Sequence, residues 1–423
     1  MMKRWVWGTL AAFLLSLVVM GWAQAEENDQ GEPAKQAGPE SAAKPETGRK
    51  EIPVIGTGYP FSGPDTGFGV GASAIYRDMA GKVGRDQTFS VSYTQTKYKS
   101  FSLDWSEPDF LRKGPRADIY LSFDNKPSRR FYGFGNDTDI KDICNYGWDM
   151  YEIRPAYIYP SGASKFRAKL QYDYQFVKPH DGTLDDPNDL LYSRPISQLY
   201  PEVFHSRQFD GGATAGPGLF LINDTRKDRF QLGGDREDKI YPVAGGYREV
   251  QLHYFGPMVG SRFEYMKEQL DLRQYFGFFK DNTVLVLRGK LVAVQGDVPF
   301  WNLPSFGGGN DLRGFYDGRF RGNDSSQYNI ELRQGIAPNT KVSLFKGAVV
   351  LKYPFLFAFF EAGRVYDSYT RFGADWDKDY HPSYGGGFRF IVSPSVVIRI
   401  ELAFSPEQTK LLGGFILNAS EPF

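Results

Sequence analysis

The sequence has little of what disulfide frameworks, metal centres and the common hydrolases require. Among its 423 residues there is one cysteine, Cys144, which excludes an internal disulfide and a cysteine-based zinc cage. The four histidines occur in no H-E-x-x-H spacing, and the chain has neither a G-x-S-x-G nucleophile elbow nor a phosphate loop ending in Gly-Lys-Ser or Gly-Lys-Thr. We therefore predict no catalytic residue, no metal site and no cofactor, and we do not expect an enzyme.

Long apolar runs are also missing, except at the start of the chain. Lys3 and Arg4 precede an apolar segment from Trp5 to Trp22, and Ala23-Gln24-Ala25 follows as an A-x-A cleavage site. This pattern predicts a signal peptide over residues 1–25. An uncleaved anchor helix is the alternative, because the run is close to the length that spans a bilayer. Cleavage would leave a mature chain that begins near Glu26, outside the inner membrane.

Neither sign of charge dominates the sequence. Its 50 basic and 50 acidic residues give a net charge of +0, so we do not expect a nucleic-acid partner. The segment from Glu26 to Lys50 has no apolar residue larger than alanine and contains three prolines, Pro33, Pro39 and Pro45. Such a segment buries too little apolar surface to offset its ordering entropy, which predicts a disordered linker over 26–51. From 52 to 423 the composition is uniform, which predicts one domain.

Aromatic residues and glycine, by contrast, are abundant, at 16% of the chain and 47 residues respectively, and apolar and polar residues alternate strictly. Phe166, Leu170 and Tyr174 belong to the apolar set of one such run, and Arg167 and Asp173 to its polar set. In a strand these sets point to opposite faces. The longest runs reach the roughly ten residues that cross a membrane at a tilt. Because a sheet in lipid can leave no edge open, the pattern predicts an all-β fold, a closed transmembrane antiparallel β-barrel.

The alternation also locates the individual strands. We expect them at 66–78, 86–97, 100–107, 116–124, 147–160, 164–179, 212–225, 245–256, 261–275, 283–296, 326–337, 346–366, 383–393, 394–405 and 412–423. This is an odd number, whereas bacterial barrels have an even number of strands, so one more is expected within 125–146 or 181–209. Tight turns such as Ser161-Gly162 and Ser393-Pro394 are expected at the periplasmic end, and the long connections 180–211, 297–325 and 367–382 at the outer end.

Several short motifs occur in a fixed order along the expected barrel. Residues 306–315 read FGGGNDLRGF, and this segment resembles the conserved loop of the BamA/TamA superfamily, also called the bacterial surface antigen family. Residues 359–363 resemble a second family motif, aromatic-x-Asp-x-Gly, with Glu361 in the place of the aspartate. The glycine-rich segment 385–389, with Ser393-Pro394 after it, resembles the family's next strand, and 131–136 and 224–226 resemble family strand ends. The resemblance covers the whole expected barrel.

The resemblance implies a barrel of about sixteen strands in which a long outer loop folds into the lumen. The matching loop motif is Leu312, Arg313, Gly314 and Phe315, and the candidate partners in the barrel wall are Phe359, Glu361, Gly363 and Arg389. An arginine folded into the lumen keeps its charge and needs a carboxylate nearby. We therefore predict a contact between Arg313 and Glu361 that holds the loop across the pore. A solvated Arg313 on a surface loop is the alternative.

Glycines gather in the expected first and last strands, at Gly67, Gly69 and Gly71 and at Gly413 and Gly414. Glycine weakens strand packing. In the BamA-like family the first and last strands form a weak seam that opens toward lipid, and the resemblance implies such a seam here. Ordinary kinks in the strands are an equal alternative.

The same resemblance sets the expected function. Family members carry periplasmic polypeptide-transport-associated domains before the barrel, whereas here we expect a barrel-only member, because the linker is too short for a folded domain. We expect a monomeric protein of the bacterial outer membrane that acts in membrane biogenesis, by protein insertion or translocation or by lipid handling. Its expected partners are outer-membrane lipid and possible client proteins or periplasmic partners. A passive solute pore is the alternative, and an outer-membrane hydrolase is a remote one.

Overall fold

The computed structural model describes residues 54–418 with gaps at 64–66, 78–87, 96–97, 108–109, 111–114, 161–163, 184–191, 230–240, 337–340, 345–348, 367–378 and 393–395. The expected signal peptide (1–25) and linker (26–51) lie outside these residues, and so do the expected turns at Ser161-Gly162 and Ser393-Pro394. Val54–Phe423 belongs to one compact unit.

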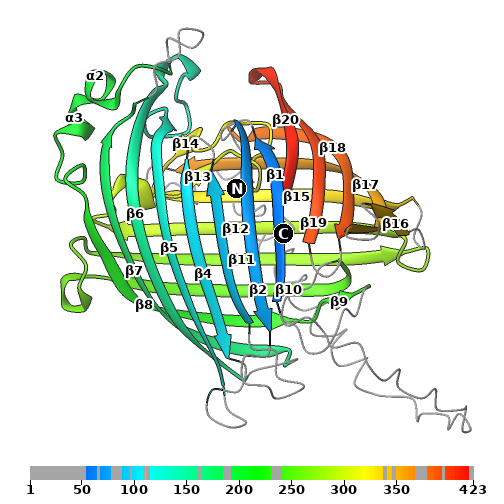
Figure 1. The fold of residues 1–423 in the computed structure, drawn as a ribbon. Helices are drawn as coiled ribbons and strands as arrows, with labels where there is room; N and C mark the ends of the chain where they lie inside the picture. Colours follow the sequence, from blue (N-terminus) through cyan, green and yellow to red (C-terminus); the bar gives the residue numbers. More distant parts are fainter. Residues whose placement is uncertain are drawn as a thin grey trace, which may run out of the picture. The chain divides into compact units, whose positions relative to one another are not determined.

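The described residues form mainly antiparallel strands, which confirms the expected fold class (Figure 1). Each long strand pairs with its neighbours in sequence, from the β1–β2 ladder to the β19–β20 ladder. The strands are β1 (Val54–Gly63), β2 (Gly67–Arg77), β3 (Thr88–Gln95), β4 (Lys99–Glu107), β5 (Arg116–Phe131), β6 (Cys144–Tyr159), β7 (Phe166–Asp181), β8 (Gly212–Asp224), β9 (Lys227–Asp228), β10 (Pro242–Phe255), β11 (Tyr265–Phe278), β12 (Thr283–Gly296), β13 (Ser305–Phe306), β14 (Phe320–Arg321), β15 (Asp324–Gly335), β16 (Lys341–Leu344), β17 (Val349–Tyr366), β18 (His381–Val392), β19 (Val396–Ser405) and β20 (Gln408–Asn418).

Eighteen of the strands in the described residues belong to one sheet, and β13 and β14 pair separately. Within the large sheet β9 and β16 span two and four residues, and the other strands span at least eight. The sheet curves around an interior, and β1 and β20, the blue and red strands of Figure 1, lie side by side. The short helices α2 (Ile196–Leu199) and α3 (Pro201–Phe204) lie between β7 and β8, and three 3-10 turns complete the described elements, η1 (Ile140–Asp142), η2 (Pro257–Val259) and η3 (Phe300–Asn302).

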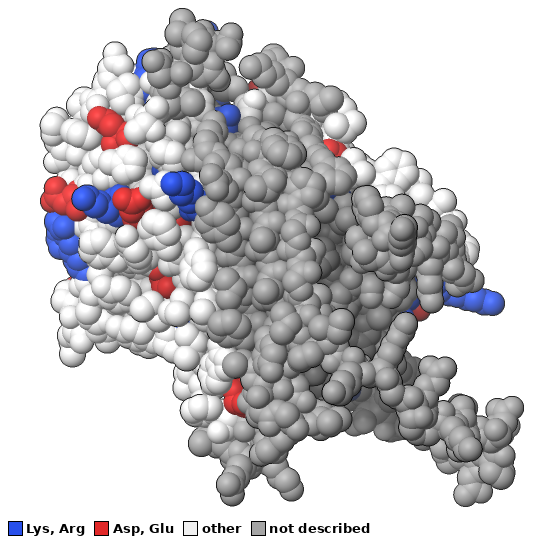
Figure 2. Space-filling view, viewed as in Figure 1, with Lys and Arg blue, Asp and Glu red and all other residues white. Residues whose placement is uncertain are grey.

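The two faces of the sheet differ as the alternation predicts. Along β7 the apolar side chains of Phe166 and Leu170 are 58% and 57% exposed, whereas Arg167 and Val177 on the other face are buried. Other large apolar side chains, such as that of Leu402, are exposed in the same way. Figure 2 shows the described part of one side as largely uncharged, with Lys, Arg, Asp and Glu gathered in a few groups. A soluble monomer rarely exposes so much apolar surface, so this outer face is the one that contacts lipid.

The additional strand expected within 125–146 or 181–209 is not found in the described part of those segments, and this placement was wrong. The missed strand is β1, whose sequence VIGTGYPFSG contains glycine and proline, the residues that are depleted in strands. Residues 125–131 continue β5 past a register shift between Lys126 and Arg129. The described part of 181–209 contains α2 and α3. Gly67, Gly69 and Gly71 consequently lie in the second strand and not in the first.

The interior face of the sheet is partly filled near the end where β12 is followed by β15. A cluster of buried aromatic and aliphatic side chains lies there, and it includes Phe131, Tyr146, Phe263 and Phe300. None of the helices in the described residues has the length and apolar character of a membrane span. The charged side chains of the candidate site lie in the interior of the same sheet.

Candidate functional site in the barrel interior

The connection between β12 and β15, residues 297–323, folds into the interior, and we call it the lumen loop. Its two arms pair through β13 and β14, with Phe306 opposite Phe320. Between these arms the chain turns at Gly307, where φ is +116° and a Cβ atom would lie 1.9 Å from the carbonyl oxygen of Tyr316. Only glycine fits a position with that backbone conformation and that close an approach. The turn directs residues 309–315 against the strands β17, β18 and β19.

Arg313, near the tip of the lumen loop, is bound to Glu361 of β17. The backbone N–H of Arg313 donates to Oε2 of Glu361 at 2.9 Å, and its Nε donates to Oε1 at 2.8 Å. Asn329 and Ser383 also donate to this carboxylate, at 2.9 and 3.2 Å. The Arg313 guanidinium lies over the ring of Phe359, with Cζ 3.4 Å from the ring centroid. The structure thus brings together the loop arginine and the carboxylate that stands at the family's aspartate position.

Two further carboxylates surround the same guanidinium. Nη1 of Arg313 lies 3.4 Å from Oε2 of Glu331 and 3.3 Å from Oε2 of Glu401. Burial acts to lower the pKa of Arg313, but the carboxylates of Glu361, Glu401 and Glu331 outweigh it and raise that pKa above its ordinary value. Arg313 is 3% exposed, and Glu361 and Glu331 are fully buried. At this burial a hydrogen-bonded ion pair is held firmly, because releasing either partner alone would leave an uncompensated charge.

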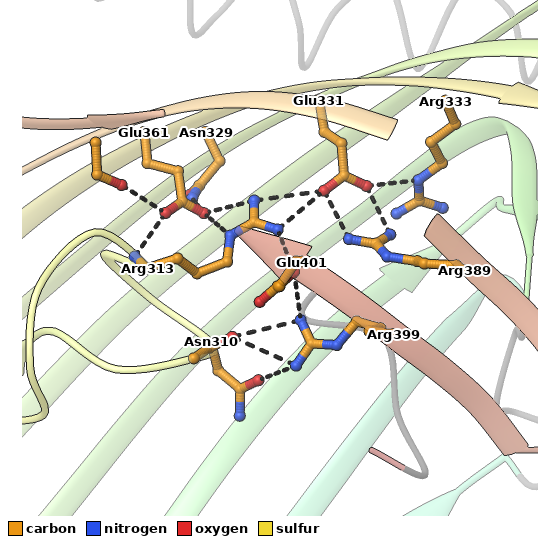
Figure 3. Close-up of polar contacts among 11 residues, drawn as sticks. Asn310, Arg313, Asn329, Glu331, Arg333, Glu361, Arg389, Arg399 and Glu401 are labelled. Carbon is orange, nitrogen blue, oxygen red and sulfur yellow. Dashed lines mark hydrogen bonds and ion pairs between the residues drawn. The ribbon is translucent and has the colours of Figure 1, made fainter. Parts of the chain in front are cut away.

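The network continues beyond Arg313 along the interior wall (Figure 3). Glu331 of β15 accepts two parallel hydrogen bonds from Arg389 of β18, at 2.7 and 2.8 Å, and a third from Nε of Arg333 at 2.8 Å. Arg399 of β19 lies 3.7 Å from Glu401 and donates to the backbone oxygen of Gly309 and to Oδ1 of Asn310 in the loop. The bidentate Arg389–Glu331 pair is the geometry in which arginine binds a carboxylate most strongly.

The formal charges in this buried network do not cancel. It contains four arginines and three glutamates, so their sum is +1. Glu331 and Glu401 each lie within ion-pair distance of two or more arginines, which distributes the negative charge over the cluster. The loop therefore contributes one cation to a wall that already holds three, and its position depends on the three wall carboxylates together.

Apolar packing fixes the remaining loop motif residues. Leu312 and Phe315 are buried in one cluster with Phe306, Phe320 and Val365. At Gly314, a Cβ atom would lie 2.5 Å from the backbone oxygen of Phe404 and 2.8 Å from Cβ of Ser383, so the loop touches the wall where it has no side chain. At Gly363, an added Cβ would lie 3.2 Å from the ring of Phe306. At Gly322, an added Cβ would lie 2.8 Å from the backbone oxygen of Tyr366. These three glycines are points of close approach between the lumen loop and the barrel wall.

The structure places the sequence-predicted residues in two groups. Phe359, Glu361 and Gly363 contact the lumen loop directly, as described above. Arg389 is linked to the loop through Glu331, which lies between Arg389 and Arg313.

Sequence reasoning missed four wall residues of the network, Glu331, Arg333, Arg399 and Glu401. A signal for them exists, because each alternates with exposed apolar neighbours such as Ile330, Leu332, Ile400 and Leu402. Their inward direction was therefore readable from the sequence, and their mutual contacts were not.

A second segment covers the lumen loop from the β5–β6 side. We call residues 132–143, between β5 and β6, the cover segment. The N–H of Gly135 donates to the backbone oxygen of Arg321 at 2.7 Å, and Arg319 donates to the side chain and backbone oxygens of Thr138, both at 2.6 Å. Asn136 accepts from the N–H of Val365 at 3.1 Å and donates to the backbone oxygen of Asp379 at 2.8 Å. The cover segment thus connects β5 and β6 with the lumen loop and with β17.

The chemistry of this arrangement is that of a fixed plug. Arginine cannot act as a general base at ordinary pH, and each network glutamate is held by hydrogen bonds or ion pairs from arginine. Among the described residues no group of three or more His, Cys, Asp and Glu side chains could hold a metal ion. The geometry supports a mechanical role, in which ion pairs and apolar packing hold a loop inside a barrel.

Comparisons with known proteins place this architecture in context. The model of the Omp85 superfamily domain matches residues 82–411. No curated protein matches the sequence. Among solved structures, BamA from Haemophilus ducreyi lacking POTRA domains 1–3 matches with a TM-score of 0.56 at 14% identity, covering 86% of this chain and 69% of that one. CdiB from Escherichia coli matches with a TM-score of 0.53 at 12% identity, covering 85% of this chain and 60% of that one. At these identities the structural matches show a shared fold.

Proposed function

Because this chain belongs to the Omp85 superfamily of bacterial outer-membrane β-barrels, we propose that it acts in outer-membrane biogenesis, by inserting or translocating polypeptide or by handling lipid. The observation that carries the proposal is the lumen loop bound through Arg313 to Glu361, with Glu331 and Glu401 beside it. A loop fixed in this way obstructs the interior. Its release, or movement of the wall around it, would change access from the interior to lipid.

The proposal includes partners and oligomeric state. The outer face is apolar, so the protein lies in outer-membrane lipid. We propose that client outer-membrane proteins or periplasmic partners meet it there, as BamA-like proteins meet theirs, and that the barrel acts as a monomer. The proposal assigns no catalytic step to this chain. This chain covers 69% and 60% of the lengths of the two structural relatives, so we do not assign their full activities to it.

A passive solute pore is the second candidate. It would use the same barrel, with the lumen loop merely narrowing the channel. The buried network of four arginines and three glutamates that holds the loop argues against a pore, since a loop that only narrows a channel needs no such network. Single-channel conductance separates the two functions. A large, steady conductance that is unchanged by deletion of residues 306–320 would favour the pore.

The test of the proposed function is depletion of the protein in cells, followed by an inventory of outer-membrane proteins and lipids. We expect a defined set of them to decrease and to recover on expression of the wild-type chain but not of Arg313→Ala. Unchanged protein and lipid inventories, with an altered uptake of small solutes, would overturn the proposal in favour of the pore. Phospholipase and protease assays on the purified barrel test the remote hydrolase alternative.

A further inference from the structure

A second charged site lies in the interior, away from Arg313, on the wall formed by β11 and β12. Lys267 of β11 and Lys290 of β12 both line a cavity of about 120 Å³ between this wall and the lumen loop. Gln269 lines it from the wall, and Asn302, Ser305 and Asp311 line it from the loop. The two lysines are at inward-facing positions, because β11 and β12 alternate with exposed residues such as Met266 on the lipid side.

Neither lysine has an ion-pair or hydrogen-bond partner for its ammonium group within the described part of the chain. The carboxylate directly across from Lys290 in the β11–β12 ladder is Asp271. Asp271 is already held by Arg273 and Arg288, each at 2.8 Å, so it does not neutralise the lysine. Asp311 lies in the same cavity without forming an ion pair to either lysine. The charged residues that line the cavity therefore sum to +1.

A second observation beside the cavity also indicates a missing partner. Gln327 of β15 stands directly opposite Lys290 in the β12–β15 ladder. It is fully buried, and neither its Nε2 nor its Oε1 has a hydrogen-bond partner in the protein. A buried carboxamide without partners costs free energy, and native structures supply such groups with water or a ligand. Gln327 does not itself line the cavity, but it shows that polar groups next to the cavity lack partners among the described residues. The two unpaired lysines, which do line the cavity, favour an anion inside it.

We propose that Lys267 and Lys290 form a binding site for a phosphate group between the β11–β12 wall and the lumen loop. Lysine binds phosphate as a point charge, and amide groups donate to the remaining oxygens. The donors available at the site are the two ammonium groups and the carboxamide of Gln269. Nδ2 of Asn302 already donates to Tyr265 and Thr214, so Asn302 shapes the cavity without supplying a free donor. The phosphate is either a free inorganic ion or the headgroup of a phospholipid. This site goes beyond the proposed function and does not depend on it.

Because Asp311 carries a negative charge in the same cavity, removing it should change phosphate affinity in the opposite direction to removing the lysines. Asp311 belongs to the lumen loop, and its negative charge in the cavity opposes an anion there. A phosphate site predicts opposite effects for the two kinds of charge. Lys267→Gln with Lys290→Gln abolishes binding, whereas Asp311→Asn tightens it, by roughly two- to tenfold for removal of one like charge at this range. A lysine pair that served only the fold would not give this pair of opposite effects.

The experiment measures binding to the purified full chain in detergent. ³¹P NMR follows the line width of inorganic phosphate at constant ionic strength, set with sodium chloride. Native mass spectrometry compares retention of phosphatidylglycerol with retention of a diacylglycerol of the same chains, which lacks the phosphate. The matched control is Lys141→Gln with Lys280→Gln, which removes the same charge at two exposed positions outside the cavity. Heat-modifiable gel migration shows that each variant is folded.

We expect the wild type and the exposed-lysine control to bind one or both phosphate probes, Asp311→Asn to bind more tightly, and the Lys267/Lys290 variant to lose binding. Broadening of the phosphate signal alone assigns the site to free phosphate, and selective retention of phosphatidylglycerol assigns it to the headgroup. Equal behaviour of the wild type and the folded Lys267/Lys290 variant would overturn the proposal. Loss of binding in the exposed-lysine control, or weaker binding in Asp311→Asn, would do the same.

Discussion

Glu361 holds Arg313 by the main chain and by the side chain at once, because its two oxygens accept separately from the backbone N–H and from Nε. This places both the path of the lumen loop and the direction of its arginine under the control of one carboxylate. A surface ion pair has no such effect, since its long side chains move while the backbone stays in place. The pair is therefore the point at which a single substitution should separate the loop from the wall.

The first prediction concerns Arg313→Ala. The change leaves three buried glutamates with one cation fewer, and breaking a buried pair in this way costs about 3–5 kcal/mol. We expect the barrel to lose its compact gel migration at a lower temperature than the wild type. Arg313→Lys should give an intermediate result, because it keeps the positive charge that Arg313→Ala removes but not the fork of donors. Unchanged migration of both variants would contradict a structural lock at this position.

The second prediction uses the close approach at Gly314. In Gly314→Ala the new Cβ would lie 2.5 Å from the backbone oxygen of Phe404, so the loop must move away from the wall. Overpacking of this kind costs about 1–3 kcal/mol. The control is Gly289→Ala in β12, where the nearest atom to the new Cβ, in Tyr328, is 3.9 Å away. The temperature at which the compact gel migration is lost should fall for Gly314→Ala and should not change for Gly289→Ala. Equal effects of the two substitutions would count against tight docking of the loop.

How far the sequence predicts this fold depends on which faces of the strands carry the signal. Alternation located the strands around Phe166 and Leu402 because one face is apolar along the full strand. It did not reveal β1, since Gly56, Gly58 and Pro60 occupy one face there and remove the contrast on which the pattern depends. The extra strand expected within 125–146 was misplaced for a related reason. Pro127 lies inside the register shift of β5, and in the sequence it looks like the end of that strand, although β5 continues to Phe131.

The site divides in a similar way. Arg313 and Glu361 could be paired in advance because a family motif marks each of them. Glu331, Arg389 and Glu401 could be assigned to the interior by alternation. Their contacts, however, depend on how strands that are far apart in the sequence are shifted relative to one another along the barrel axis. This relative shift is set by the registers of all the intervening ladders, including the irregularity between Lys352 and Phe355 in the β17–β18 pair. No local pattern contains this information.

A third prediction follows from the dependence of three arginines on Glu331. Glu331→Gln raises the formal charge of the network from +1 to +2 and removes the partner of Arg333 and Arg389. We expect the free energy of unfolding to fall by about 3–5 kcal/mol, measured by denaturant unfolding as the product of the midpoint and the slope m. The double variant Glu331→Gln with Arg389→Gln removes one charge of each sign, so it should be more stable than the sum of the single effects predicts.

The control for this cycle is Glu202→Gln, which removes the same charge from an exposed position in α3. Its free energy of unfolding should stay within about 0.5 kcal/mol of that of the wild type. Strict additivity of the Glu331 and Arg389 substitutions would mean that the two side chains do not interact in the folded barrel, contrary to their 2.7 and 2.8 Å hydrogen bonds.

The last prediction concerns the cover segment. Asn136 binds the backbone of Val365 and of Asp379, and the backbone oxygen of Asn136 lies 3.1 Å from Nε2 of His381. In Asn136→Ala the amide of Val365 loses its acceptor, and each lost hydrogen bond costs about 0.5–1.5 kcal/mol. We expect faster hydrogen exchange at Val365 and in the cover segment, while the Arg313–Glu361 contact keeps the lumen loop protected. Asp137→Ala, at the exposed neighbouring position, is the matched control and should leave exchange unchanged. Faster exchange of the entire lumen loop in Asn136→Ala would instead show that the loop is held from the cover segment and not from the wall.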